Sequence, residues 1–175
     1  MTEDLSELQE HAEHAAHEPG LAAVTVTMAI FAVLVAAASL LGHRAHTEEL
    51  LLQTKATDQW AYYQAKAIRR YESDIARDIL AAVSAGQNGV QKYAANLARY
   101  EKEAEEIQGE AQKLEAESHV RGRQALRAHF GEVFLEIGIV LASLAILTKR
   151  KDVWYISMLS SAGGLATAAT ALLIR

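Results

Sequence analysis

Residues 90–114 read VQKYAANLARYEKEAEEIQGEAQKL, and this stretch determines the fold that we predict. Its apolar positions follow one another at alternating steps of three and four residues, a repeat that is typical of a coiled-coil seam. Charged side chains fill the other faces of the predicted helix. The seam residues that we expect to pack against another helix are Val90, Tyr93, Leu97, Tyr100, Ala104, Ile107, Ala111 and Leu114.

Residues 43–84, directly before this seam, contain no proline and are expected to form one continuous helix. We expect this helix to pack against the seam. Gly86 and Gly89 predict a turn near residues 85–89, since glycine readily adopts the positive φ that ends a helix. The polar segment 43–129 is therefore predicted to be a helical hairpin. In its first arm, apolar side chains at sevenfold-related spacing are assigned to hairpin or oligomer packing: Ala61, Ile68, Tyr71, Ile75 and Ala82, with Trp60 and Ile79 beside them.

Three apolar segments flank the hairpin, at residues 21–42, 130–148 and 153–174. Roughly 20 apolar residues at about 1.5 Å each cross a hydrocarbon core of about 30 Å, so each segment is predicted to be a transmembrane helix. Residues 149–152 form a basic turn between the last two. The predicted fold class is an all-α membrane protein with three transmembrane helices and a long antiparallel coiled-coil hairpin, about residues 44–128, between the first and second. A close contact between transmembrane helices is predicted at the small residues Ser160, Gly164 and Ala168.

Residues 1–20 form an acidic, histidine-containing tail without lysine or arginine. A secretory signal begins with basic residues, so the first apolar segment is expected to remain as a membrane anchor. Three spans place the tail and the basic turn on one side of the membrane and the hairpin on the other. The positive-inside rule, applied to the short basic turn, favours a hairpin outside the cytoplasm, whereas Arg121, Arg123 and Arg127 favour the opposite orientation.

Composition narrows the possible functions. The chain has no cysteine, which excludes disulfides and thiolate metal sites. Its net charge of −5 argues against a general nucleic-acid binder. The sequence contains no nucleophile elbow, P-loop, HExxH or CxxC motif, so we expect neither enzymatic activity nor a cofactor.

The most informative polar residues are Glu132 and Glu136, one helical turn apart, with His129 three residues before the first. A carboxylate inside an apolar segment is costly, so it is expected to face protein or water, pair with a cation or stay protonated. One interpretation is a proton or cation site, or a metal site built by repeating these residues around an oligomer axis. The alternative, which we favour, is interfacial placement beside basic partners such as Arg123, Arg127, His43 or Arg44.

Two further histidine groups are candidate sites. His43 and His46 follow the first apolar segment, and a closed hairpin would bring His129 to the same level. These three histidines could form a pH-sensitive collar. The alternative, which we favour, is that they are packing and hydrogen-bonding groups at the membrane surface. His11, His14 and His17 step by three in the acidic tail, a spacing that suits zinc, nickel or copper, although such tails commonly bind no metal.

The seam of alanine and tyrosine offers few large aliphatic side chains. At about 25 cal/mol per Å2 of buried apolar surface, a hairpin with so thin a contact is marginal alone. Additional helices from other copies of the chain would remedy this, so we expect a homo-oligomer.

Three blocks of the sequence resemble a bacterial family of small membrane proteins known as domain of unknown function 4337. They are LLGHRAHTEELLLQTKATDQWAYYQAKAIR (residues 40–69), EKEAEEIQGEA (101–111) and GEVFLEIGIVLASLAILT (131–148). The resemblance covers most of the chain after residue 20. It implies a membrane-anchored helical hairpin of bacterial origin, and it carries over no activity and no catalytic residue.

These observations leave two hypotheses. The first is a non-enzymatic, homo-oligomeric protein of the bacterial inner membrane whose hairpin acts as a scaffold or contacts an unidentified protein partner. The second is a channel or proton- or cation-conducting assembly that uses Glu132 and Glu136. Its partners in either case are the lipid bilayer and its own copies, with no nucleic acid.

Overall fold

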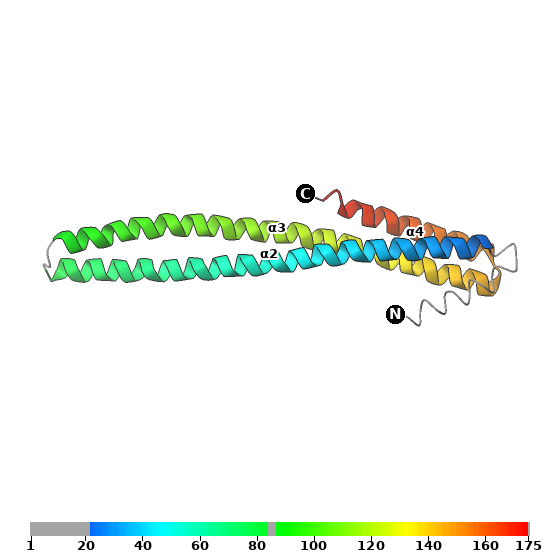
Figure 1. The fold of residues 1–175 in the computed structure, drawn as a ribbon, viewed down its shortest axis with the longest axis horizontal. Coiled ribbons are helices and arrows are strands. Elements are labelled where there is room, and N and C mark those ends of the chain that lie inside the picture. Colours follow the sequence, from blue (N-terminus) through cyan, green and yellow to red (C-terminus); the bar gives the residue numbers. More distant parts are fainter. Residues whose placement is uncertain (1–21, 84–86, 175) are drawn as a thin grey trace. The chain divides into compact units, whose positions relative to one another are not determined.

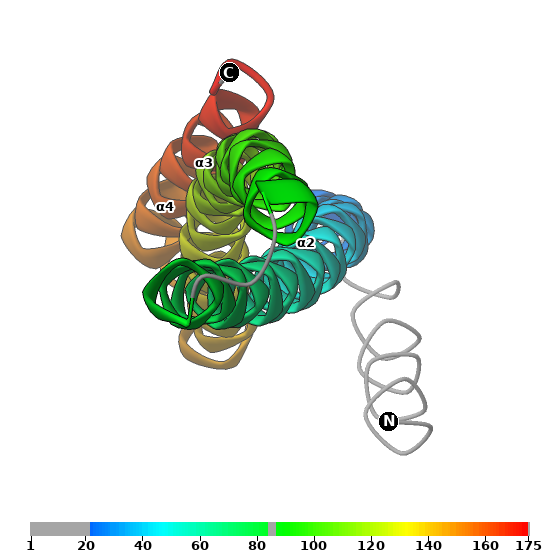
Figure 2. The same ribbon diagram turned by 90° about the vertical axis from the view of Figure 1, so that its left-hand side faces the viewer.

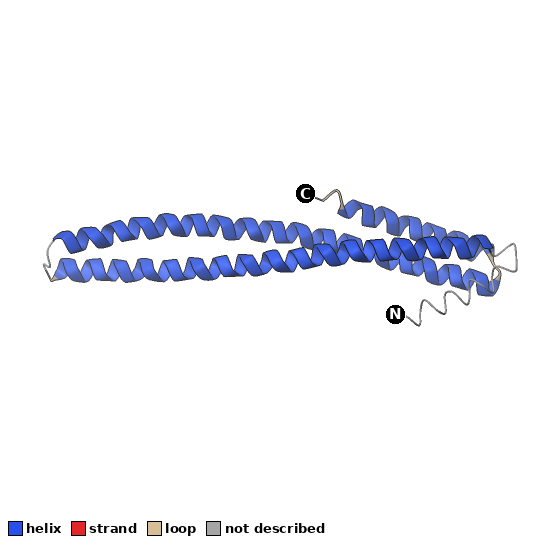
Figure 3. Ribbon diagram, viewed as in Figure 1, coloured by secondary structure: helices blue, strands red, loops and turns tan. Residues whose placement is uncertain are grey.

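The computed structural model describes residues 22–83 and 87–174. Within these ranges the chain forms three helices and no strand: α2 (Ala22–Ala82), α3 (Gln87–Thr148) and α4 (Lys151–Ala171) (Figures 1 and 3). The predicted all-helical fold is therefore confirmed for the described residues. The acidic tail, with His11, His14 and His17, lies outside them.

The helix α2 runs for 61 residues without a break, from its apolar first third into the polar hairpin arm. Alanine is abundant along it and proline is absent, which favours an uninterrupted helix. At its end, the Val83 amide donates to the Ile79 carbonyl oxygen at 3.0 Å.

The predicted turn near residues 85–89 lies partly outside the described residues, and its second glycine is helical. Gly89 lies inside α3, and no glycine among the described residues has a positive φ. The glycine serves close packing instead, because a Cβ there would lie 3.2 Å from Leu80 Cδ1 on the opposite arm. Gly86, the other glycine of the predicted turn, lies outside the described residues.

The connection between α3 and α4 is shorter than the predicted turn and consists of Lys149 and Arg150. Lys149 has a φ of 55°, in the left-handed region that ends a helix. Arg150 Nη2 donates to Asp152 Oδ2 at 3.2 Å, and this carboxylate lies in the first turn of α4, where the helix dipole favours negative charge. The short link places α4 back along α3.

The prediction of three membrane spans is supported for two helices. Among the described residues, α2 and α3 each contain a segment long and apolar enough to cross a bilayer. The helix α4 has 21 residues and ends at Ala171, short of the predicted residue 174. Serine, glycine and threonine make up much of it, which lowers its apolar character.

The chain divides into two compact units, which are described separately. The three-helix unit comprises residues 22–46 and 121–174, and the hairpin unit comprises residues 47–83 and 87–120. In the three-helix unit, α4 lies beside α3 (Figure 2) and Trp154 Nε1 donates to Thr27 Oγ1 of α2 at 3.1 Å. Its apolar core consists of two clusters, Val24, Met28, Ala142 and Ala145, and Ala38, Leu135 and Ala168.

The two arms of the hairpin unit run antiparallel (Figure 1), and polar side chains join them. Trp60 Nε1 donates to Glu115 Oε1 at 2.9 Å, and Lys66 Nζ lies 2.5 Å from Glu103 Oε2. The buried side chains of this unit are all small: Ala56, Ser73, Ala104, Ala111 and Ser118.

The two arms differ in how their apolar side chains are placed. Every predicted seam residue of α3 from Val90 to Leu114 is buried or half-buried. Of the first-arm residues assigned to hairpin or oligomer packing, Tyr71 and Ile75 are exposed in the single chain, so the oligomer alternative stays a prediction for both. The arms instead approach through alanines, serines and polar pairs, and these small contacts leave the larger α2 side chains outside.

Candidate functional site: a histidine–glutamate cluster

One polar cluster in the three-helix unit combines three of the predicted site residues. The imidazole rings of His43 and His129 meet edge to face, with their centroids 6.0 Å apart and an interplanar angle of 72°. His129 Nδ1 lies 3.2 Å from Glu132 Oε2, one helical turn later. We call His43, His129 and Glu132 the histidine–glutamate cluster.

A glycine makes room for this cluster. Gly42 is buried, and a Cβ at this position would lie 3.3 Å from His129 Cε1. His43 Nδ1 lies 2.9 Å from the Ser39 carbonyl oxygen, which accepts only, so this nitrogen carries the proton and donates. In the neutral ring Nε2 is then the nitrogen that accepts hydrogen bonds or binds a metal.

Glu132 and Glu136 have different surroundings, although the sequence groups them. The Glu132 side chain is 16% exposed and paired with His129. Glu136 is exposed, and within the described residues it forms no hydrogen bond or ion pair. The cluster therefore includes one of the two acids. His46, the other histidine predicted at this level, is exposed on α2.

The cluster is incomplete as a metal site within one chain. Among residues 22–83 and 87–174, no group of three histidine, aspartate or glutamate side chains is arranged to hold a metal ion. His129 and Glu132 supply two ligand atoms on one helix face. A metal site here would need ligands from another copy, as the interpretation of a repeated site around an axis requires.

A second polar cluster fixes the register of the hairpin arms. Lys66 Nζ pairs with Glu103 and lies 5.2 Å from the centroid of the Tyr62 ring and 5.6 Å from that of Tyr100. The hydrogen bond to Glu103 raises the pKa of Lys66, and the same bond lowers the pKa of Glu103. With the Lys66 side chain only 12% exposed, this pair acts as a structural contact between the arms.

The pairing of Glu103 with Lys66 was not predicted, because Glu103 lies among the charged residues that fill the outer faces of the predicted helix. The signal was available, because residues facing each other across an antiparallel hairpin lie equally far from its turn. Leu80 and Gly89 meet next to the turn, and Lys66 and Glu103 lie 14 residues further along each arm.

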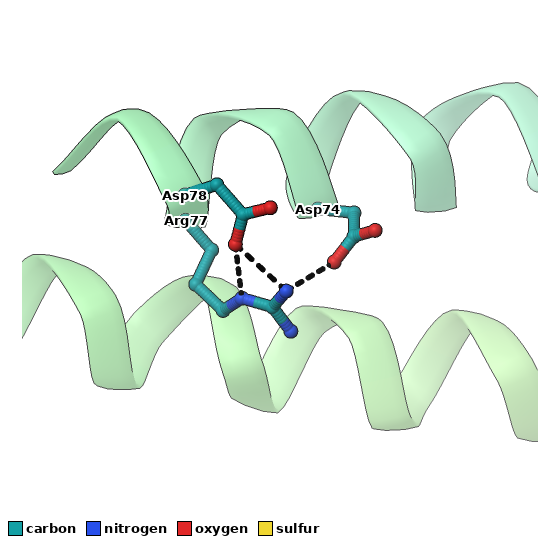
Figure 4. Close-up of polar contacts among 3 residues, drawn as sticks. All are labelled: Asp74, Arg77 and Asp78. Carbon is teal, nitrogen blue, oxygen red and sulfur yellow. Dashed lines mark hydrogen bonds and ion pairs between the residues drawn. The ribbon is translucent and has the colours of Figure 1, made fainter. Parts of the chain in front are cut away.

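A third polar group lies on one arm only. The Arg77 guanidinium lies between two carboxylates of α2, with Nη2 at 2.6 Å from Asp74 Oδ1 and 2.8 Å from Asp78 Oδ1 (Figure 4). These contacts raise the pKa of Arg77, chiefly through the hydrogen bond to Asp78. The group stabilises the helix locally and does not link the arms.

The predicted close contact of α4 is present, and it involves more residues than the sequence indicated. Gly164 and Ala168 pack against Gly131, where an added Cβ would lie 2.6 Å from Ala168 Cβ. Ser160 Oγ donates to the Phe134 carbonyl oxygen at 2.9 Å. The residues that the sequence analysis missed are Gly131, Gly138, Ser157 and Ser161; the seven-residue spacing of the two glycines was the available signal.

The three-helix unit is organised with small residues inside and large apolar residues outside. Glycine, alanine and serine dominate its buried contacts, whereas its surface exposes many branched and aromatic side chains. Exposed apolar patches of this extent mark interaction or membrane surfaces. The exposed large residues of this unit are Val26, Ile30, Val33, Leu40, Leu41, Leu126, Phe130, Val133, Phe134, Ile137, Val140, Leu144, Leu147, Tyr155, Ile156, Met158, Leu159, Leu165, Leu172 and Leu173.

The comparisons with known proteins agree with the resemblance seen in the sequence. The model of a family described as domain of unknown function (DUF4337) matches residues 20–174. No curated protein and no solved structure matches the chain. The matched range contains both structural units and every described helix, so the chain belongs to the DUF4337 family.

Proposed function

We propose that the protein is a membrane-anchored, non-enzymatic helical hairpin that assembles with its own copies and serves as a scaffold or interaction module. The observation that carries the membrane part is the organisation of the three-helix unit, with small residues buried and large apolar residues exposed. In water, so large an exposed apolar surface would be unfavourable. In a bilayer, the same apolar side chains face the lipid tails, and their exposure is favourable.

The assembly part is supported by the thin core of the hairpin unit. Its buried side chains are three alanines and two serines, and each buried methyl group contributes only about 0.8 kcal/mol. Two long helices held by such contacts and a few polar pairs gain little from each other alone. Further helices from other copies supply the missing apolar contact.

The site of action is the bacterial inner membrane, with the hairpin outside the cytoplasm. The supporting feature is the short basic connection at Lys149–Lys151, which the positive-inside rule places in the cytoplasm. With α4 as a third span, the hairpin lies on the opposite side, where it is free to contact other copies or a protein partner.

The mass of the particle in mild detergent tests the assembly. Light scattering coupled to size-exclusion chromatography, with the detergent contribution subtracted, is expected to give a whole-number multiple of 19.1 kDa greater than one. A particle that remains monomeric at every protein concentration contradicts the proposal.

A second candidate function is proton or cation conduction. It is favoured by Glu136, an exposed carboxyl one turn after the Glu132–His129 pair on the same apolar segment. In an assembly that conducts, these acids line a central path. Conduction predicts that the chain carries a proton or potassium flux into reconstituted vesicles and that Glu136→Gln abolishes it. The scaffold function predicts no flux from either chain.

A further inference from the structure

The outer face of the α2 arm carries a continuous row of large apolar side chains. Ile68, Tyr71, Ile75, Ile79 and Val83 are each 57–65% exposed. Their steps of three and four residues place them along one side of the helix. We call these five residues the α2 stripe. It lies on the opposite side of α2 from Lys66 and Ser73, which face the α3 arm.

The α3 arm has no corresponding feature. Between residues 87 and 120, no large apolar side chain is exposed. Charged residues and alanines form its outer face, including Lys92, Glu101, Lys102, Glu105, Glu106 and Glu110. The unpartnered apolar surface of this part of the hairpin is therefore confined to a single helix.

We infer that the α2 stripe is the contact between two copies of the chain, which pair α2 against α2 in parallel and in register. This inference rests on the proposed assembly and names the surface that forms it. A symmetric pair brings the same stripe of each copy together. Each apolar row then buries the other, and no second complementary surface is needed.

The area of the stripe suits this occupant. The five residues expose on the order of 600 Å2 per copy, so a pair covers at most about 1,200 Å2, the lower end of the range for specific interfaces. Anchoring both copies in one membrane raises their effective concentration, and a contact of this size is then sufficient.

The direction of pairing follows from the anchor. The stripe from Ile68 to Ile79 belongs to the same uninterrupted helix, α2, as the apolar first segment, and Val83 directly follows that helix. Copies inserted with the same topology run this helix in the same direction, so neighbouring stripes are parallel. A parallel two-fold pair sets Ile68 opposite Ile68 and Ile75 opposite Ile75, which is the seam geometry of a parallel coiled coil.

Cysteine cross-linking of the full-length chain in membranes tests the pairing. The natural chain has no cysteine, so single substitutions report one position each. Ile68→Cys, Tyr71→Cys and Ile75→Cys are made separately and oxidised with copper phenanthroline. The matched control is Ala98→Cys, an exposed position on the α3 arm.

All three stripe variants are expected to form dimers at levels at least about fivefold above Ala98→Cys, because facing seam positions bring Cα atoms within disulfide reach. Dimers from Ile75→Cys alone, without Ile68→Cys or Tyr71→Cys, indicate antiparallel pairing and overturn the inference. Dimer levels equal to the control, or cross-links to a different polypeptide, also overturn it.

A second variant separates this inference from the proposed assembly. Ile75→Asp places two carboxylates at the centre of the paired stripes, and it is expected to lower the particle mass in mild detergent, whereas Ala98→Asp leaves the mass unchanged. A particle that stays oligomeric with Ile75→Asp, together with control-level cross-linking, refutes the stripe and leaves the assembly in place. A natural chain that is monomeric refutes both.

Discussion

The three-helix unit and the hairpin unit both pack through small residues, yet they use them differently. In the three-helix unit, Gly131 and Gly164 let the α3 and α4 backbones approach closely, and large apolar side chains cover the outside. In the hairpin unit, alanines and serines hold the arms together with a few polar pairs, and one arm alone exposes an apolar row. This difference is the one that the proposed membrane anchoring predicts, with lipid around the three-helix unit and water around the hairpin unit.

The largest effect is expected where the helices of the three-helix unit are closest. A valine at Gly131 would place its Cβ 2.6 Å from Ala168 Cβ and 2.7 Å from the Gly164 carbonyl oxygen. Gly131→Val is therefore expected to destabilise the unit by about 3 kcal/mol. Thermal unfolding in detergent measures the loss.

The matched control for this change is Gly163→Val on α4, because an added Cβ at Gly163 meets no atom within 4 Å. Its melting temperature is expected to stay close to that of the natural chain. Equal melting temperatures for the two variants would show that the close approach of α3 and α4 does not stabilise the unit.

A smaller effect, an increase in stability, is expected when Ser161 is replaced. Its hydroxyl is buried and has no hydrogen-bond partner within the described residues. Ser161→Ala removes this unpaired group and is expected to stabilise the protein by about 1 kcal/mol. Ser157→Ala is the comparison, since Ser157 Oγ donates to the Trp154 carbonyl oxygen at 2.7 Å. A larger gain from Ser157→Ala than from Ser161→Ala would contradict the assignment.

The hairpin unit should tolerate the replacement of a helical glycine by a larger residue, which the three-helix unit does not tolerate at Gly131. Gly109 lies within α3, and an added Cβ there meets nothing within 4 Å. Gly109→Ala is expected to stabilise the hairpin by up to about 1 kcal/mol through helix propensity alone. A fall in the melting temperature would indicate that the glycine is needed for a contact with another copy.

The smallest effect concerns the Lys66–Glu103 pair, a single ion pair whose Glu103 side chain is 34% exposed and therefore partly screened by salt. The hydrogen bond from Lys66 lowers the pKa of Glu103 below its ordinary 4.5, so its contribution is present above that value and is lost as the pH falls through the lowered pKa. The pKa of Lys66 is raised above 10.5, so its contribution is present below that value and is lost as the pH rises through the raised pKa.

Glu103→Gln is expected to reduce the loss of helical circular dichroism signal between about pH 5 and pH 3 relative to the natural chain. The control is Glu110→Gln, at an exposed position on the same arm without an ion pair among the described residues. If both variants follow the acid transition of the natural chain, the pair does not contribute to the pH dependence.

Much of the fold could be predicted because it follows from periodicity and apolar length. The α3 seam from Val90 to Leu114 has a regular repeat, and the structure places it on the inner side of the hairpin. The outward position of Ile75 could not be derived, since the same stripe suits either the other arm or another copy. The arms resolve this through Lys66 and Glu103, whose pairing depends on the register and not on any apolar pattern.

The candidate site was predictable in part for the same reason. Spacing alone grouped His129, Glu132 and Glu136 on one helix face, and the antiparallel pairing of α2 and α3 brings His43 to His129. The difference between the half-buried Glu132 and the exposed Glu136 depends on where the neighbouring helix lies. Sequence spacing on a single helix does not contain that information.

One labelling experiment tests most directly whether lipid surrounds one unit and water the other. Ala98 and Ser143 are exposed small residues on the same helix, α3, one in each unit. Each is replaced by cysteine, and sheared-open membranes are treated with a water-soluble maleimide, which reacts with the thiolate form. Ala98→Cys should be labelled before any detergent is added, and Ser143→Cys only after denaturing detergent is added. Equal labelling of both positions without detergent would contradict the proposed membrane anchoring.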